Sequence, residues 1–225
     1  MALAHNLTSL VCSILAWIFF IIGCIGNSTG SDNVQNAPWI IVNPDNGGNH
    51  IFFGTQAFYQ KNTNMLPEDL VKYKNCEDTI DFCTPCLDNG RVTFALLVIA
   101  VIFAALAIIF SIVLLVAEVP SVQYTNLTLT GASTVMAVVG WSVFMRRCYH
   151  SIDEVVSTLE YGAGASLTLL GFLLMGIAVI VNVLNIVYPT APAAATAGSS
   201  KRAPVPQAEE EDSKIVATEE AKPVE

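Results

Sequence analysis

Four long apolar segments, none of which contains Asp, Glu, Lys, Arg or His, divide the chain at residues 7–26, 92–117, 127–145 and 161–188. Each has about 18 to 28 residues, enough to cross a hydrocarbon core of ~30 Å at 1.5 Å per residue. Backbone amides inside a bilayer must be paired within the segment, so such spans should be α-helices. The pattern predicts an all-α membrane protein, a left-handed four-helix bundle with both chain ends on one side of the membrane.

Composition supports the membrane interpretation and bears on the first segment. The chain is 53% hydrophobic and only 13% charged, whereas soluble domains are about 25% charged. A cleaved signal peptide would begin with a basic region and have an apolar run of about 7 to 15 residues. The first segment has no Lys or Arg before it and a longer apolar run, so we expect it to remain as a transmembrane helix.

The first connection, residues 27–91, is long enough to hold a small folded unit. Along it lie, in order, a segment of strand-like composition, a turn sequence, and a proline followed by acidic residues. The predicted elements are a strand at 38–42, a turn at 43–48, a returning strand at 51–54 and a short helix at 67–72. We therefore expect a small antiparallel sheet that caps the bundle, followed by a helix before Cys76.

The remaining connections are short, and the C-terminal region has a different composition. Residues 118–126 should form a tight turn between antiparallel helices. Within residues 146–160, the segment 152–156 could extend a helix beyond the membrane. Residues 189–225 are rich in Pro, Ala, Ser and Glu and cannot bury a core, so we expect a disordered acidic tail. The predicted domains are thus the transmembrane domain, residues 1–188, and this tail.

Two signals disagree about which end of the bundle faces outward. Arg146 and Arg147 follow the third segment, and the positive-inside rule would place their loop in the cytoplasm. That loop and the first one share a side and together hold four cysteines, an even number suited to disulfide bonds outside the reducing cytosol. We give the cysteines more weight. This predicts two extracellular loops, cytoplasmic termini and a multi-pass protein of the plasma membrane or cell surface.

The loop cysteines Cys76, Cys83, Cys86 and Cys148 allow three interpretations. As disulfides they permit three pairings, of which we favour Cys76–Cys86 with Cys83–Cys148, a pairing that ties the two loops together. A structural zinc site formed by these thiols, with His150 replacing one of them, is the second. The third is a redox dithiol at the Cys83-Thr84-Pro85-Cys86 spacing, although the neighbouring acidic residues would disfavour a thiolate.

The apolar segments hold no ionisable side chain, which excludes buried proton relays, ion carriers and voltage sensors. Their mild polar residues are expected to hydrogen-bond between helices, and their glycines to pack the bundle or face a neighbouring subunit. These residues are Ser13, Ser111, Thr130, Ser133, Thr134, Ser142, Ser166, Thr168, Asn182 and Asn185, with Gly131, Gly140, Gly162, Gly164, Gly171 and Gly176. Trp141 lies near a segment end and fits an aromatic belt. No catalytic constellation can be assembled, so we expect no enzyme, metal or cofactor.

The outer loops show a recognisable pattern: Trp39 before paired cysteines, Arg91 at the exit of a long first loop, and a short second outer loop. In this pattern the chain resembles the claudin and peripheral-myelin-like tetraspan superfamily. Within it the chain is most similar to the amastins, surface glycoproteins of kinetoplastid parasites. The separation of Cys76 and Cys86 is that of the amastin signature cysteines, and residues 160–172 resemble the amastin entry into the fourth helix. The Trp-Gly core usual between those cysteines and the claudin C-terminal PDZ ligand are both missing.

These features predict a non-enzymatic protein of membrane organisation or surface protein–protein interaction. A neighbour would meet the first loop at Trp39, Ile40, Ile41, Phe52 and Phe53, with Arg91 as a further candidate. Burial of the same apolar residues in the core of the loop is the alternative.

A function of a different class is that of an accessory subunit in a larger channel or transporter complex. The expected partners in either case are membrane lipids and other membrane proteins or a second copy, and no nucleic acid. Of the sequons at Asn6, Asn27 and Asn126, only Asn27 lies on the predicted outer side, so it is the candidate glycosylation site.

Overall fold

The computed structural model describes residues 2–26, 30–43, 50–61, 69–76, 80–117, 119–153 and 158–188. The helices are α1 (Ala2–Ile25), α2 (Ser31–Asn36), α3 (Cys83–Val116), α4 (Pro120–Phe144), α5 (His150–Asp153) and α6 (Ala163–Val187). The strands are β1 (Ile40–Val42), β2 (His50–Phe53), β3 (Ala57–Lys61), β4 (Asp69–Lys72) and β5 (Leu159–Tyr161). A 3₁₀ turn, η1 (Tyr73–Asn75), precedes Cys76, and a π-helical segment, η2 (Met145–Tyr149), joins α4 to α5.

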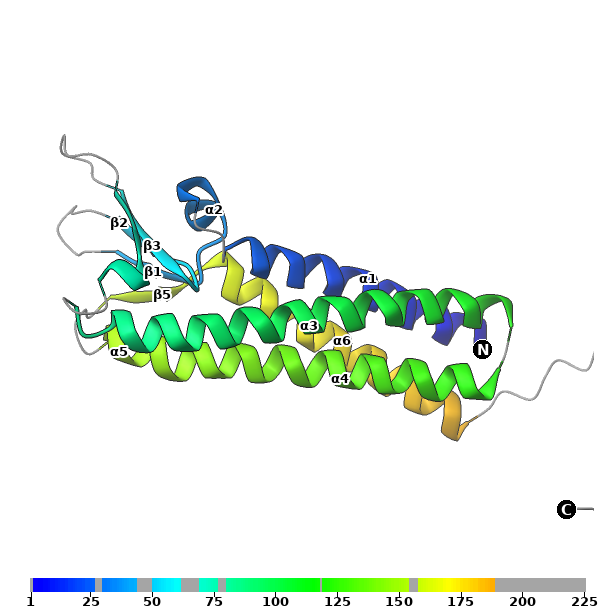
Figure 1. Cartoon of the computed structure of the whole chain (residues 1–225). Helices are drawn as coiled ribbons and strands as arrows, with labels where there is room; N and C mark the ends of the chain where they lie inside the picture. Colours follow the sequence, from blue (N-terminus) through cyan, green and yellow to red (C-terminus); the bar gives the residue numbers. More distant parts are fainter. Residues whose placement is uncertain are drawn as a thin grey trace, which may run out of the picture. The chain divides into compact units, whose positions relative to one another are not determined.

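The long helices α1, α3, α4 and α6 form a bundle with the sheet at one end (Figure 1). Within the described ranges, four helical spans are long and apolar enough to cross a membrane: Ala4–Ile25, Cys83–Val116, Pro120–Asp153 and Ala163–Val187. Helix α1 packs against α6 and α3, while α4 packs against α3 and α6. The predicted tetraspan bundle is confirmed. We refer below to its sheet end and, opposite, to the turn end, where α3 passes into α4.

Three helices, α1, α3 and α4, extend farther than the apolar segments predicted. Helix α1 begins at Ala2 rather than at residue 7. Helix α4 begins at Pro120, so the tight turn predicted at 118–126 is wrong over residues 120–126. Helix α3 begins at Cys83 rather than at residue 92, and its 34 residues span about 51 Å at 1.5 Å per residue, more than a hydrocarbon core of ~30 Å. The helical path that starts at Pro120 continues to Asp153, past the predicted end at residue 145. Absence of charge marks only the part of a helix that lies in lipid, so the polar ends of α3 and α4 at the sheet end were missed.

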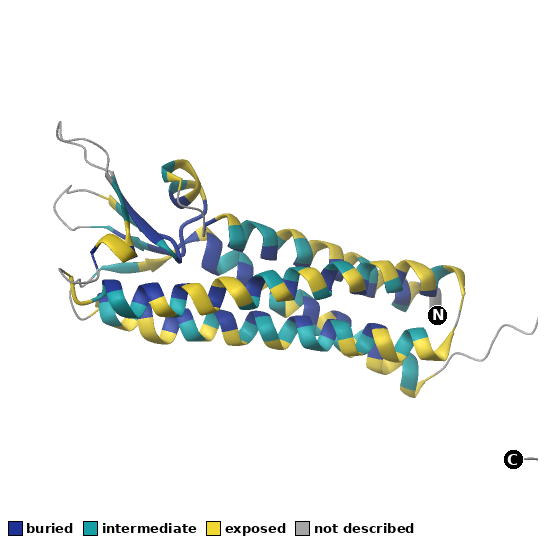
Figure 2. Ribbon diagram, viewed as in Figure 1, coloured by how far each residue is buried: buried dark blue, intermediate teal, exposed yellow. Residues whose placement is uncertain are grey.

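Many small side chains are buried between the helices, and many large apolar ones are exposed on the bundle surface. Figure 2 shows buried and exposed positions alternating along the long helices. Six helical alanines have no exposed surface: Ala16, Ala100, Ala104, Ala107, Ala137 and Ala178. By contrast, Ile102, Ile109 and Ile180 are each more than half exposed. This arrangement suits a surrounding of lipid tails, in which large apolar groups lose nothing by exposure and small ones let helices approach closely.

Side-chain hydrogen bonds join all four long helices near the turn end. They run from His5 Nδ1 to Asn185 Oδ1 (2.9 Å), Asn185 Nδ2 to Asn6 Oδ1 (2.8 Å), Asn6 Nδ2 to Leu114 O (3.2 Å), Ser9 Oγ to Asn182 Oδ1 (3.1 Å), Asn182 Nδ2 to Thr130 Oγ1 (3.5 Å) and Asn126 Nδ2 to Ser111 Oγ (3.2 Å). The interhelical role predicted for Ser111, Asn182 and Asn185 is confirmed. Thr134 and Thr168 instead donate to carbonyls of their own helices.

Both loops of the sheet end build one antiparallel sheet, in the order β4-β3-β2-β1-β5. The predicted hairpin is confirmed, since Ile40 of β1 pairs with Phe53 of β2. Strand β5 comes from the second loop and pairs with β1 on its other edge, Ile41 opposite Glu160. The sheet therefore connects segments that lie more than 100 residues apart in sequence.

The short helix expected at residues 67–72 is wrong over the part that the structure describes. Residues 69–72 form β4, whose Val71 pairs with Phe58 of β3. The acidic helix-start signal is local and weak, whereas pairing with β3 satisfies the backbone and packs Val71 against the core. Residues 44–48 of the turn predicted at 43–48, residues 62–68 and the tail at 189–225 lie outside the described residues.

Glycines pack the bundle at most of the predicted positions. Added methyl groups at Gly140, Gly164 and Gly171 would press on neighbouring elements, but at Gly131 and Gly176 nothing lies within 4 Å. The closest contact is at Gly90 of α3, where a Cβ would overlap the carbonyl oxygen of Thr55. This glycine lets α3 pass directly under the turn between β2 and β3.

Gly90→Ala is expected to destabilise the protein by about 1–3 kcal/mol, because backbone must move to admit the methyl group. Gly131→Ala is the matched control, also inside a long helix but with open space around it. It should leave stability unchanged or raise it by up to ~1 kcal/mol, since alanine is the better helix former. Thermal unfolding of the two variants in detergent measures the difference, and equal melting temperatures would contradict the close packing at Gly90.

Candidate functional site

Two disulfide bonds fasten the sheet end together. Cys76 bonds to Cys83, and Cys86 bonds to Cys148. The favoured pairing, Cys76–Cys86 with Cys83–Cys148, is therefore wrong, although all four cysteines are disulfide-bonded. Cys83 and Cys86 are one helical turn apart in α3, so Cys83 at the helix start meets the η1 turn while Cys86 faces η2. The prediction treated both as loop residues, for which no such geometry applied.

The disulfides also decide between the chemical interpretations of these cysteines. Each of the four is at most 4% exposed, and Cys83 and Cys86 are bonded to different partners rather than to each other. A redox dithiol needs accessible sulfurs that exchange with one another, and a zinc site needs free thiolates. Neither interpretation fits this arrangement, whereas a structural role does.

Trp39 attaches the sheet to the helices. Its side chain has no exposed surface, its Nε1 donates to the carbonyl oxygen of Gly23 at 3.0 Å, and its ring meets Phe144 edge-on at 5.1 Å. Gly164 of α6 lies so close to the indole that a Cβ there would be 2.9 Å from it. Trp39 is thus a core residue shared by α1, α4 and α6, and the prediction that it contacts a neighbouring protein is wrong.

The two faces of the sheet divide the remaining candidates. Successive strand residues point to opposite faces, and accordingly Ile40 and Phe53 are buried while Ile41 and Phe52 are partly exposed. Phe53 packs against Phe58 and Phe82 within 6 Å between ring centroids, so it belongs to the core that covers the end of α3. Because Ile40 and Phe53 are buried, they cannot contact a neighbouring protein. Ile41 and Phe52 remain candidates for that contact.

Tyr73 holds the turn between β2 and β3 from below. It is fully buried, and its hydroxyl donates to the carbonyl oxygen of Gly54 at 2.8 Å. Burial raises the pKa of the Tyr73 phenol, because the charged form would lose its hydration. The hydroxyl therefore stays protonated as a donor, and the turn above Gly90 keeps its shape.

The last predicted site residues lie apart from the sheet face. Arg91 directly follows Gly90 in α3 and is exposed. Asn27 lies outside the described residues. The two other sequon asparagines, Asn6 and Asn126, are 8% and 1% exposed and hydrogen-bond within the bundle, so neither is accessible to glycosylation in the folded protein.

The geometry is that of a tetraspan membrane protein whose sheet is held on the bundle by disulfides and a buried tryptophan. In comparisons with known proteins, no curated protein matches the chain. A family model described as Amastin, amastin surface glycoprotein, matches residues 63–188, more than half of the 225 residues. The matched region contains all four disulfide cysteines and three of the four transmembrane helices. The chain therefore belongs to the amastin surface glycoprotein family.

Proposed function

We propose that this protein is a non-enzymatic surface protein that organises the membrane by contacting neighbouring proteins through the outward face of its sheet. The observation that carries the proposal is the division of the sheet into two faces. Ile40 and Phe53 pack on the bundle, whereas Ile41 and Phe52 form a partly exposed apolar pair on the other face. Apolar side chains that a fold leaves accessible in this way suit a contact surface.

The rigid attachment of the sheet supports the same proposal. The Cys76–Cys83 disulfide joins the segment that follows β4 to the start of α3, and Trp39 joins β1 to the helices. A surface fixed in this manner loses little conformational freedom on binding, which favours association. In the proposed orientation, with both termini in the cytoplasm, the sheet lies on the outer side of the plasma membrane.

Phe52→Glu tests the proposal. The substitution places a charge in the middle of the outward face and should reduce cross-linking to neighbouring surface proteins, or to a second copy, about fivefold or more. The measurement is amine-reactive cross-linking on intact cells, followed by mass spectrometry that identifies and quantifies each linked protein.

Ile80→Glu is the matched control, because Ile80 is also an exposed apolar residue at the sheet end but lies outside the sheet. Its cross-links should match those of the wild-type protein. The proposal fails if Phe52→Glu and Ile80→Glu give the same cross-links as the wild type while the folded protein reaches the surface in equal amounts.

A second function, that of an accessory subunit in a larger membrane complex, is favoured by Gly131 and Gly176. Nothing lies within 4 Å of the position where a Cβ would stand at either residue, so another transmembrane helix could approach α4 or α6 closely there. Gly131→Leu and Gly176→Leu would then release a larger co-purifying membrane protein. Under the first proposal they would leave the sheet-mediated cross-links unchanged.

A further inference from the structure

A basic hollow lies where α4 passes into η2 and α5. It has a volume of about 530 Å³ and is lined by Met145, Arg146, Arg147, His150 and Ser151. Arg146 and Arg147 are both exposed there. The hollow therefore carries two positive charges that a ligand can reach.

Aromatic side chains show how deep this hollow sits in the membrane. The rings of Tyr149 and Tyr161 stack at 5.4 Å, and Trp141, one turn before Met145, lies 6.4 Å from Tyr161. Tryptophan and tyrosine gather at the level of lipid headgroups, so this cluster is consistent with the aromatic belt expected at Trp141. The residues that line the basic hollow come directly after Trp141 in the chain. We therefore expect the hollow at the level of the lipid headgroups.

A second, smaller hollow adjoins the same aromatic cluster on the lipid side. It has a volume of about 150 Å³ and is lined by Trp141, Tyr161, Ala165, Ser166 and Leu169. Trp141 is held there by a hydrogen bond from its Nε1 to the carbonyl oxygen of Ala165 at 3.1 Å. This mostly apolar space on the transmembrane helices α4 and α6 suits a hydrocarbon chain.

We infer that Arg146 and Arg147 bind the phosphate of a membrane phospholipid whose acyl chains lie along the apolar outer surface of the transmembrane helices. Guanidinium groups donate paired hydrogen bonds to phosphate oxygens. The segment that carries both arginines is π-helical, and π-helical turns occur frequently at functional sites. The site also gives a local reason for two arginines at the disulfide-bonded end, which the positive-inside rule alone does not.

Native mass spectrometry of the full-length protein in detergent tests this inference with three probes. Dioleoyl phosphatidylglycerol carries both phosphate and chains, dioleoylglycerol carries the chains alone, and inorganic phosphate carries the anion alone. The phospholipid should bind at least about tenfold more tightly than either of the others, because each lacks one half of the site. If inorganic phosphate binds as tightly as the phospholipid, the ligand is a free anion, and if dioleoylglycerol does so, the arginines play no part; either result overturns the proposal.

The double variant Arg146→Gln/Arg147→Gln should bind the phospholipid about tenfold or more weakly, with an unchanged melting temperature in the absence of lipid. The matched control is Lys74→Gln/Arg91→Gln, which removes the same charge from two exposed residues at the same end of the bundle. It should bind like the wild type. An equal loss in both double variants would show non-specific attraction by net charge and would overturn the site. The probe series on the wild-type protein does not depend on the folding of any variant.

Discussion

Replacing Cys86 and Cys148 together by serine is expected to lower the free energy of unfolding by about 4 kcal/mol. The bond closes a loop with a sequence separation of 62 residues, and cross-linking a loop of this size restricts the unfolded chain by about that amount. It also joins α3 to η2 directly beneath the sheet. Unfolding of purified protein in mixed detergents measures the loss, and reduced amounts at the cell surface should accompany it.

Cys76→Ser/Cys83→Ser serves as the internal comparison. Its bond spans a separation of only 7 residues, so the chain-entropy effect is about 2–3 kcal/mol and should be the smaller of the two. Mapping of disulfide-linked peptides should find Cys76–Cys83 and Cys86–Cys148. Peptides that link Cys76 to Cys86 would show that α3 does not begin where the structure places it.

Trp39→Ala should destabilise the protein by about 3–5 kcal/mol, the usual effect of removing a large aromatic side chain from a core. The substitution removes the contact with Phe144 and leaves the carbonyl oxygen of Gly23 without its donor. Because Trp39 connects β1 to three helices, the sheet should loosen before the bundle does. Faster hydrogen exchange of the sheet amides would report this loosening.

Two further substitutions locate the cause of the Trp39 effect. Trp39→Phe keeps a ring but lacks the indole donor, so it should cost about 1–2 kcal/mol. Phe52→Ala removes an aromatic side chain from the outward face of the same sheet and should cost less than ~1 kcal/mol. A loss at Phe52 as large as that at Trp39 would contradict the assignment of the two sheet faces.

Much of the bundle could be predicted because each transmembrane segment is a continuous apolar run with its own length limit. The same rule could not find the polar start of α3, from Cys83 to Arg91, which is helical but lies beyond the lipid. The wrong disulfide pairing follows from that omission, since Cys83 and Cys86 were placed in a loop. A helix-based argument from their spacing of three residues would have separated their partners.

Long-range pairing explains the other errors. Strand β5 has only three residues and pairs with β1 from the second loop, so no local pattern marks it, and Tyr161 was assigned to the last helix. Asn6 and Asn126 stand in sequons, but the contacts that bury both in the bundle join distant parts of the chain and have no local sequence signal. The alternation of Ile40 with Ile41 and of Phe52 with Phe53 was visible in the sequence and could have divided the contact candidates correctly.

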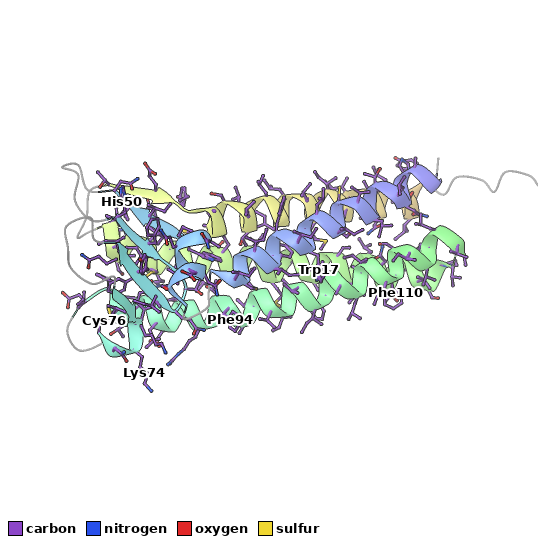
Figure 3. All side chains as sticks on the ribbon, turned by 90° about the horizontal axis from the view of Figure 1, so that it is seen from above. Trp17, His50, Lys74, Cys76, Phe94 and Phe110 are labelled. Atoms are coloured by element: carbon purple, nitrogen blue, oxygen red, sulfur yellow. A yellow bond between two sulfur atoms is a disulfide. The ribbon has the colours of Figure 1, made fainter. Side chains whose placement is uncertain are left out.

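The measurement that tests the account most directly is labelling of lysines on intact cells with a membrane-impermeant amine reagent. Lys72 and Lys74 are exposed at the sheet end, and Figure 3 shows Lys74 pointing away from the ribbon. Lys201, Lys214 and Lys222 belong to the tail, and in the proposed orientation the tail is cytoplasmic. Lys72 and Lys74 should be labelled before permeabilisation, and the tail lysines only after it. The reverse pattern would place the sheet in the cytoplasm and contradict its role as a surface for contacts between cell-surface proteins.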